Sequence, residues 1–183
     1  MKAFLYSLVF AAAVGSAAAA DFNLRSGDFK SNGELDNKFV YQGMGCHGEN
    51  VSPSLNWSGA PAGTKSYALL VHDPDAPTGG AGWWHWIVYN IPPTATALAQ
   101  GAGTKEGAAL PKGAVQGKTD FGSVGWGGPC PPQGHGKHHY QFSLYALKVE
   151  KLDVPEGASA AMIGYMANAN ALGKAQLTGL YGR

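Results

Sequence analysis

Asp73 and His85 are the residues of this chain whose types and positions most directly suggest chemistry. Asp73 follows an apolar run and opens the Asp-Pro-Asp-Ala-Pro sequence of residues 73–77, while His85 stands among three tryptophans after a glycine-rich turn, residues 78–82. A turn between two apolar strands brings the carboxylate and the imidazole to the same rim. Such a pair can transfer protons, coordinate a metal or help to hold an anion.

Side-chain alternation extends this rim to a second segment, the His-His-Tyr sequence of residues 138–140. Successive side chains of a strand point to opposite faces, so His138 and Tyr140 share one face and His139 points the other way. The predicted rows, each on one face, are Tyr67, Leu69, Val71 and Asp73; Trp83, His85, Ile87 and Tyr89; and His138, Tyr140, Phe142, Leu144 and Ala146. If the three strands are neighbours, the polar members of these rows converge on one pocket mouth.

Alternating runs outnumber helical ones, and glycine and proline punctuate the chain, which indicates a mainly β protein. We expect strands at 65–72, 84–91, 139–148 and 175–181, with weaker ones at 39–41 and 55–57. One segment, residues 158–172, has helical spacing, and Gly173 follows it where a C-cap would stand. The apolar positions of this helix are Ala158, Ala161, Met162, Tyr165, Met166, Ala169 and Leu172. Residues 94–125 are expected to form a long surface excursion with a short strand.

The first twenty residues are interpreted as a cleaved secretory signal peptide. Lys2 is followed by an apolar run and then by three alanines, a small-residue pattern that predicts cleavage after Ala20. A membrane anchor is the alternative, but the apolar stretch is too short to span a bilayer and no basic flank follows it. The mature chain, residues 21–183, is long enough for a single domain with a sizeable core. Export would place it in the periplasm or outside the cell.

The charge of the mature chain is balanced. Without Lys2 it carries 12 Lys and Arg residues and 12 Asp and Glu residues, a formal net charge of zero. This balance argues against nucleic acid as a partner and against electrostatic docking on anionic lipid, because both need an excess of basic charge.

Cys46 and Cys130 both lie in glycine- and proline-rich loop sequence. An even cysteine count in an exported protein is interpreted first as a disulfide, and two free thiols are the alternative. A bridge between them would close a loop of about 84 residues and stabilise the fold by about 4 kcal/mol in the chain-entropy model.

The polar residues also have structural interpretations. Asp73 and Asp75 suit turn positions beside prolines, and His85 suits a core position among tryptophans. The remaining isolated histidines are interpreted as surface or loop residues, since no pattern singles them out: His47, His72 and His135.

Catalysis is the least favoured interpretation. Asp73, His85 and His138 could ligate zinc in a hydrolase, but the chain has no H-E-x-x-H pair, nucleophile elbow, P-loop or dinucleotide fingerprint. His135 and His138 are three residues apart in a glycine-rich loop, where spacing alone is a weak signal. We therefore expect no catalytic residue, no metal and no cofactor.

Several motifs follow one another in a recognisable order, at residues 50–57, 73–77, 83–86, 120–122 and 128–134, the last leading into 138–140. Together they resemble the phosphatidylethanolamine-binding protein (PEBP) family, in its bacterial Raf-kinase-inhibitor-like, periplasmic branch. The resemblance covers essentially the whole mature chain. It implies a central antiparallel β-sheet packed on a second sheet with a few peripheral helices, and a cavity for phosphate-like anions and phospholipid headgroups.

By motif, the resemblance assigns ligand-binding residues to three walls of that cavity: Asp73 and Pro77; Trp83 and His85; and Pro132, His138 and Tyr140. Two imidazoles and a phenol are expected to donate hydrogen bonds to phosphate oxygens, and bonds to a charged acceptor are strong. Asp73 would orient a histidine rather than contact the anion. One departure is that glycine-rich residues 78–82 stand where mammalian members place a basic residue.

The expected function is therefore a non-enzymatic ligand-binding or regulatory module for a small phosphorylated or anionic ligand, such as a phospholipid headgroup. A protein-interaction or inhibitor role through surface loops, with an unidentified protein target, is the alternative. A homodimer is left open. Kinase inhibition does not carry over from the family name, because an exported protein would rarely meet a cytosolic eukaryotic kinase.

Overall fold

The structure, a computed structural model, describes residues 21–183, so the expected signal peptide of residues 1–20 lies outside the described residues. In chain order the elements are β1 Asn23–Arg25, β2 Gly33–Glu34, the 3-10 helix η1 Asn37–Phe39, β3 Gln42–Gly43, β4 Cys46–His47, β5 Leu55–Ser58, β6 Ser66–Asp73, β7 Trp83–Ile91, β8 Ala97–Leu98, β9 Val115–Gln116, β10 His138–Leu147, α1 Ala160–Ala169 and β11 Ala171–Tyr181.

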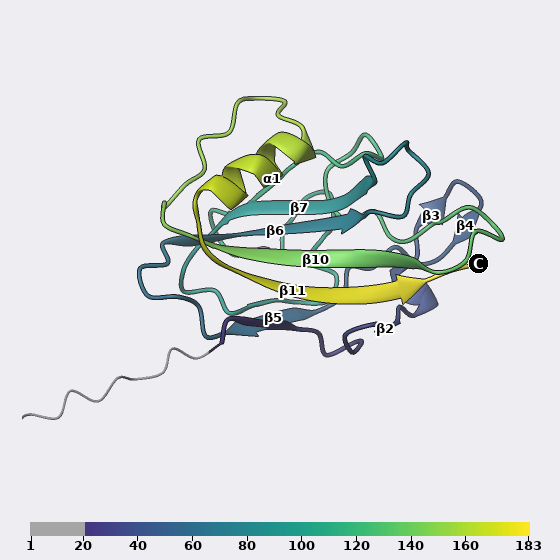
Figure 1. Ribbon diagram of the computed structural model, residues 1–183, viewed down its shortest axis with the longest axis horizontal. Helices are drawn as coiled ribbons and strands as arrows, with labels where there is room; N and C mark the ends of the chain where they lie inside the picture. Colours follow the sequence, from purple (N-terminus) through teal and green to yellow (C-terminus); the bar gives the residue numbers. More distant parts are fainter. Residues whose placement is uncertain (1–20) are drawn as a thin grey trace, which may run out of the picture.

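A six-stranded sheet in the order β2-β11-β10-β6-β7-β9 forms the centre of the fold. Its long strands pair antiparallel, and the short β11–β2 pair is parallel. The three-stranded sheet β1-β5-β8 covers one face and α1 covers the other (Figure 1). The predicted fold class is therefore confirmed: a mainly β protein with a central antiparallel sheet packed on a second sheet.

Strand β6 shows how the two faces are filled. Its Leu69 and Val71 belong to the core shared with the small sheet, whereas Leu70 belongs to the core under α1, beside Ile163. Apolar residues therefore occupy successive positions of β6, as in a strand that is covered on both sides. Among residues 21–183, no helix is long and apolar enough to cross a membrane.

The row predicted along β7 is wrong, because the strand contains a bulge. The four residues predicted to share a face were Trp83, His85, Ile87 and Tyr89. Trp84 lies opposite His72 and Trp86 opposite Val71, so His85 has no counterpart on β6. An extra residue in one strand reverses the alternation beyond it. Trp83 and His85 therefore face the cavity described below, while Ile87 and Tyr89 pack in the core under α1.

The helix is shorter than predicted and buries a different face. Ser159 caps the start of α1 by accepting a hydrogen bond from the Met162 N–H. The helix ends at Ala169, so its C-cap is Asn170 and not Gly173. Its buried residues are Ala160, Ile163 and Ala167. Met162 and Tyr165 of the predicted apolar face are exposed, and Leu172 and Gly173 belong to β11. Two of the three buried residues are alanines, so a count of large apolar residues does not identify the buried face.

Two predictions about short strands in the loop regions also need correction. The weak strand predicted at 39–41 is wrong, because Phe39 closes the 3-10 helix η1 and the chain then continues into β3. The excursion of residues 94–125 contains two short strands, β8 and β9, rather than one.

Candidate functional site

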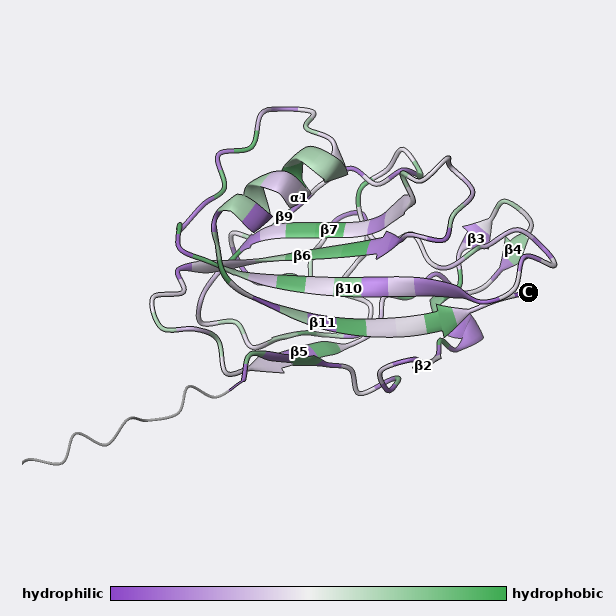
Figure 2. Cartoon of the chain, viewed as in Figure 1, coloured by the Kyte–Doolittle hydropathy of each residue, from purple (hydrophilic) through white to green (hydrophobic). Residues whose placement is uncertain are grey.

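A cavity of about 280 Å3 lies where β6 ends and where β7 and β10 begin. Figure 2 shows hydrophilic residues gathered at this end of otherwise apolar strands. The residues that line the cavity are Met44, Asp73, Ala76, Pro77, Thr78, Trp83, His85, Phe121, Cys130, Pro131, Pro132 and His138. Six of the seven predicted ligand-binding residues line this cavity. The seventh, Tyr140, is fully buried behind it, with its ring centroid 5.0 Å from that of His85.

Other hollows on the molecule are larger but lack comparable polar groups. Three of them measure about 400, 420 and 440 Å3. Within residues 21–183, none of these three is lined by a buried side-chain nitrogen or oxygen that lacks a hydrogen-bond partner. Size alone therefore does not identify the functional site.

Asp73 and His138 form a buried pair at the floor of the cavity. His138 Nδ1 lies 2.7 Å from Asp73 Oδ2, and the side chains are only 2% and 4% exposed. The other carboxylate oxygen, Oδ1, accepts a hydrogen bond from the Asp75 N–H at 2.9 Å. A carboxylate can only accept here, so the Nδ1 of His138 carries a proton and its Nε2 faces away from Asp73. Asp73 thus orients the inward-facing histidine, as expected.

His135 also takes part in this arrangement, although the sequence analysis treated it as a loop residue. Its Nδ1 lies 2.8 Å from His138 Nε2, which extends the hydrogen-bonded series from Asp73 to the protein surface. Gly134 and Gly136 flank it with φ of 76° and 87°, so the loop can turn back onto the strand. The three-residue spacing of the two histidines is the signal that could have identified this contact.

His85 is buried at 2% exposure and has only one of its two ring nitrogens engaged. Its Nδ1 lies 2.6 Å from the carbonyl oxygen of Gly127, while Nε2 has no hydrogen-bond partner within the described part of the chain. Burial lowers the pKa of His85 to about 4, although the Gly127 carbonyl and the charge of Asp73 oppose the shift. The ring is therefore neutral near pH 7. Its single proton lies on Nδ1 and is engaged with Gly127, so Nε2 has no proton to donate in this state.

Two hydrogen-bond donors complete the polar part of the site. Trp83 Nε1 and the Tyr140 hydroxyl are buried, and neither has a partner in the described region. Burial, reinforced by the negative charge of Asp73, raises the pKa of Tyr140, so its hydroxyl keeps its proton. A buried polar group without a partner costs about 1–3 kcal/mol. Retaining several such groups beside one cavity is typical of a site that a ligand completes.

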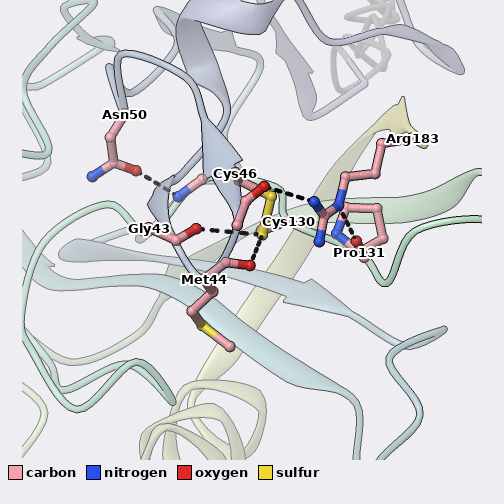
Figure 3. Close-up of a disulfide and its surroundings, with 9 residues drawn as sticks. Gly43, Met44, Cys46, Asn50, Cys130, Pro131 and Arg183 are labelled. Carbon is pink, nitrogen blue, oxygen red and sulfur yellow. Dashed lines mark hydrogen bonds between the residues drawn. A yellow bond between two sulfur atoms is a disulfide. The ribbon is translucent and has the colours of Figure 1, made fainter.

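Three chain segments are fastened together along one wall of the cavity (Figure 3). The predicted disulfide joins Cys46 to Cys130, with 5.9 Å between their Cα atoms. The Arg183 guanidinium donates to the carbonyl oxygens of Gly45 and Pro131, each at 2.7 Å. These links hold the β3–β4 hairpin and the proline-rich loop against the C-terminal residue.

The cavity lacks the charge usually supplied to strongly anionic ligands. In the described region, no Lys or Arg lines it, and the guanidinium of Arg183 is engaged with backbone carbonyls behind the wall. Asp73 contributes a carboxylate instead. Among residues 21–183 there is also no cluster of three or more His, Cys, Asp or Glu residues that could hold a metal ion.

Comparisons with known proteins agree with this architecture. A family model described as phosphatidylethanolamine-binding protein matches residues 25–182. The UPF0098 protein YbcL of Escherichia coli K12 is 52% identical over 181 residues, which cover 99% of this chain and 98% of that protein. The crystal structure of E. coli YbcL, described as a new member of the mammalian PEBP family, has a TM-score of 0.86 over 90% of this chain and 99% of its own.

A second solved structure extends the comparison to a more distant protein. The PEBP homologue CT736 from Chlamydia trachomatis is 34% identical, covers 91% of this chain and 99% of its own, and has a TM-score of 0.74. The same fold is therefore retained at much lower identity.

Proposed function

The chain belongs to the phosphatidylethanolamine-binding protein family, and from this premise we propose that its cavity binds a small phosphate-like anion or phospholipid headgroup without transforming it. The observation that carries the proposal is the set of buried, unpartnered polar atoms beside the Asp73–His138 pair, counted over the described residues. The N–H of Trp83 and the O–H of Tyr140 can donate to anionic oxygens, and hydrogen bonds to a charged acceptor are about twice as strong as neutral ones.

The chemistry of the cavity wall supports binding rather than catalysis. Covalent catalysis needs a nucleophile with an adjacent base. Of the lining residues that could serve, Cys130 is held in the disulfide and the Thr78 hydroxyl donates to the carbonyl oxygen of Gly82 at 3.0 Å. The side chains of Asp73 and His138 are bonded to each other and so act first as a rigid floor.

Isothermal titration calorimetry with phosphoethanolamine and with inorganic phosphate tests this function. We expect saturable binding by the wild type and about tenfold or greater weakening in Trp83→Phe, because a hydrogen bond to a charged acceptor contributes about 1.5–3 kcal/mol. Trp84→Phe is the matched control, since the Trp84 ring packs at a tilt against His72, with ring centroids 4.2 Å apart, and does not line the cavity. Absence of binding by the wild type, or equal binding by both variants, would contradict the proposal.

Export of the protein is part of the same proposal. The Cys46–Cys130 disulfide suits an oxidising compartment, and the sequence predicts cleavage after Ala20. Intact-mass analysis of the protein recovered from the periplasm of an expressing bacterium should give a chain that begins at Asp21 with no free thiol. A full-length chain retained in the cytosol would contradict it.

A further inference from the structure

The hydrogen bonding of His85 fixes which of its ring nitrogens carries the proton. A backbone carbonyl oxygen can only accept, so the 2.6 Å contact with Gly127 requires a proton on Nδ1. In the neutral ring the other nitrogen, Nε2, then holds a lone pair and is an acceptor. His85 lines the cavity and its Nε2 has no partner within residues 21–183.

The surroundings of His85 do not favour a second proton. The rings of Phe121 and Tyr140 meet its imidazole edge-on, with centroids 5.4 Å and 5.0 Å away. The ionisable groups near it are Asp73 and His72 on β6 and Tyr140 and His138 on β10. Asp73 is the one negative charge among these groups, and both of its oxygens already accept hydrogen bonds, from His138 and from the Asp75 N–H. No described carboxylate bonds to the imidazole of His85 itself.

A ligand in this cavity therefore meets an acceptor as well as donors. We propose that the site selects a phosphate monoester or phosphonate in its singly charged form, whose remaining P–O–H donates to His85 Nε2, and discriminates against the dianion. This inference rests on the proposed function. The charged oxygens of the same group accept from the N–H of Trp83, which lines the cavity. A dianion would instead direct a lone pair at His85 and add charge to a cavity that contains the carboxylate of Asp73 and is lined, within the described residues, by no Lys or Arg.

Calorimetric titrations of the full mature protein between pH 5 and 8 test the selection with three small probes. Methyl phosphate loses its second proton near pH 6, and methylphosphonate does so at higher pH. If only the monoanion binds, the affinity for each falls about tenfold per pH unit above that ligand's own second pKa. Dimethyl phosphate keeps one negative charge but has no O–H, so it should bind at least tenfold more weakly than methyl phosphate at pH 5.

Variants of two histidines show whether His85 is responsible. His85→Gln supplies an amide that can donate as well as accept, so we expect its affinity for methyl phosphate to depend less on pH. His139→Gln is the matched control, because His139 points away from the cavity and should keep the wild-type profile. Nitrogen NMR of the imidazoles provides a readout that needs no variant: across pH 5–8, Nε2 of His85 should have the shift of an unprotonated nitrogen.

The outcomes separate this inference from the proposed function. Binding of methyl phosphate that is unchanged above its second pKa, a break at the same pH for both titrating probes, or a protonated His85 Nε2 would overturn the inference while leaving anion binding intact. Failure of every probe at every pH would overturn the proposed function, and the inference with it.

Discussion

Two aspartate–histidine pairs lie side by side in this molecule and differ chiefly in burial. Asp73 bonds to His138 and Asp75 bonds to His139, each with 2.7 Å between an Oδ2 and an Nδ1. The side chains of the first pair are 4% and 2% exposed, and those of the second are 41% and 53% exposed. The two histidines are adjacent in β10, so the alternation of a strand sends one to the cavity and the other to solvent.

The two pairs have the same hydrogen-bond length, so length alone does not determine how much a pair stabilises the protein. Solvent competes for the groups of the exposed pair and screens their attraction, so such pairs contribute about 0–1 kcal/mol. The side chains of the buried pair are shielded from bulk solvent, so loss of one member leaves the other unsatisfied. Only the inner pair can therefore hold the cavity floor in one geometry.

The largest effect is expected when the inner carboxylate is removed. Asp73→Ala should lower the free energy of unfolding by about 3–5 kcal/mol, because it leaves His138 and the Asp75 N–H without their hydrogen-bond partner. Asp75→Ala should lower it by about 1 kcal/mol. Urea denaturation at pH 7 measures both. Equal losses in the two variants would show that burial does not distinguish the pairs.

His85 is a buried histidine that bonds to no carboxylate, and it should make the stability of the protein depend on pH. His85 has a folded-state pKa of about 4, below the unfolded value of 6.5. The unfolded chain therefore binds the extra proton first, so the contribution of neutral His85 is fully present above about pH 6.5 and is lost as pH falls towards 4. The loss amounts to about 3 kcal/mol.

Denaturation curves between pH 7 and 4 check this slope. His85→Asn, whose amide can still donate to the Gly127 carbonyl, should lose less stability than the wild type over the same range. An unchanged slope in the variant would assign the pH dependence to other groups.

The comparison also explains which features the sequence could predict. The inward His138 and outward His139 followed from alternation, because β10 is regular from its first residue to Ala146. The row predicted along β7 is wrong, because the bulge at His85 depends on how β7 pairs with β6 and not on local pattern. The contact of His135 with His138 arises from a glycine-rich loop returning to the strand, which spacing indicates only weakly. The features that the sequence could not predict are therefore those that depend on contacts between residues far apart in the chain or on the path of a loop.

The smallest effect, and the most direct test of the comparison, is the coupling within the outer pair. Partial burial raises the pKa of Asp75, but side-chain and backbone hydrogen bonds from His139 outweigh it and leave the pKa below its usual value. This contribution to stability is present above the unfolded pKa of 3.8 and disappears as pH falls below it. A double-mutant cycle of Asp75→Ala and His139→Ala should give a coupling of about 0.2–1 kcal/mol at pH 7. The cycle removes the backbone bond from the comparison, because His139→Ala keeps its N–H. The matching cycle of Asp73→Ala and His138→Ala should give a severalfold larger coupling, and equal couplings would mean that geometry rather than burial sets the strength of both pairs.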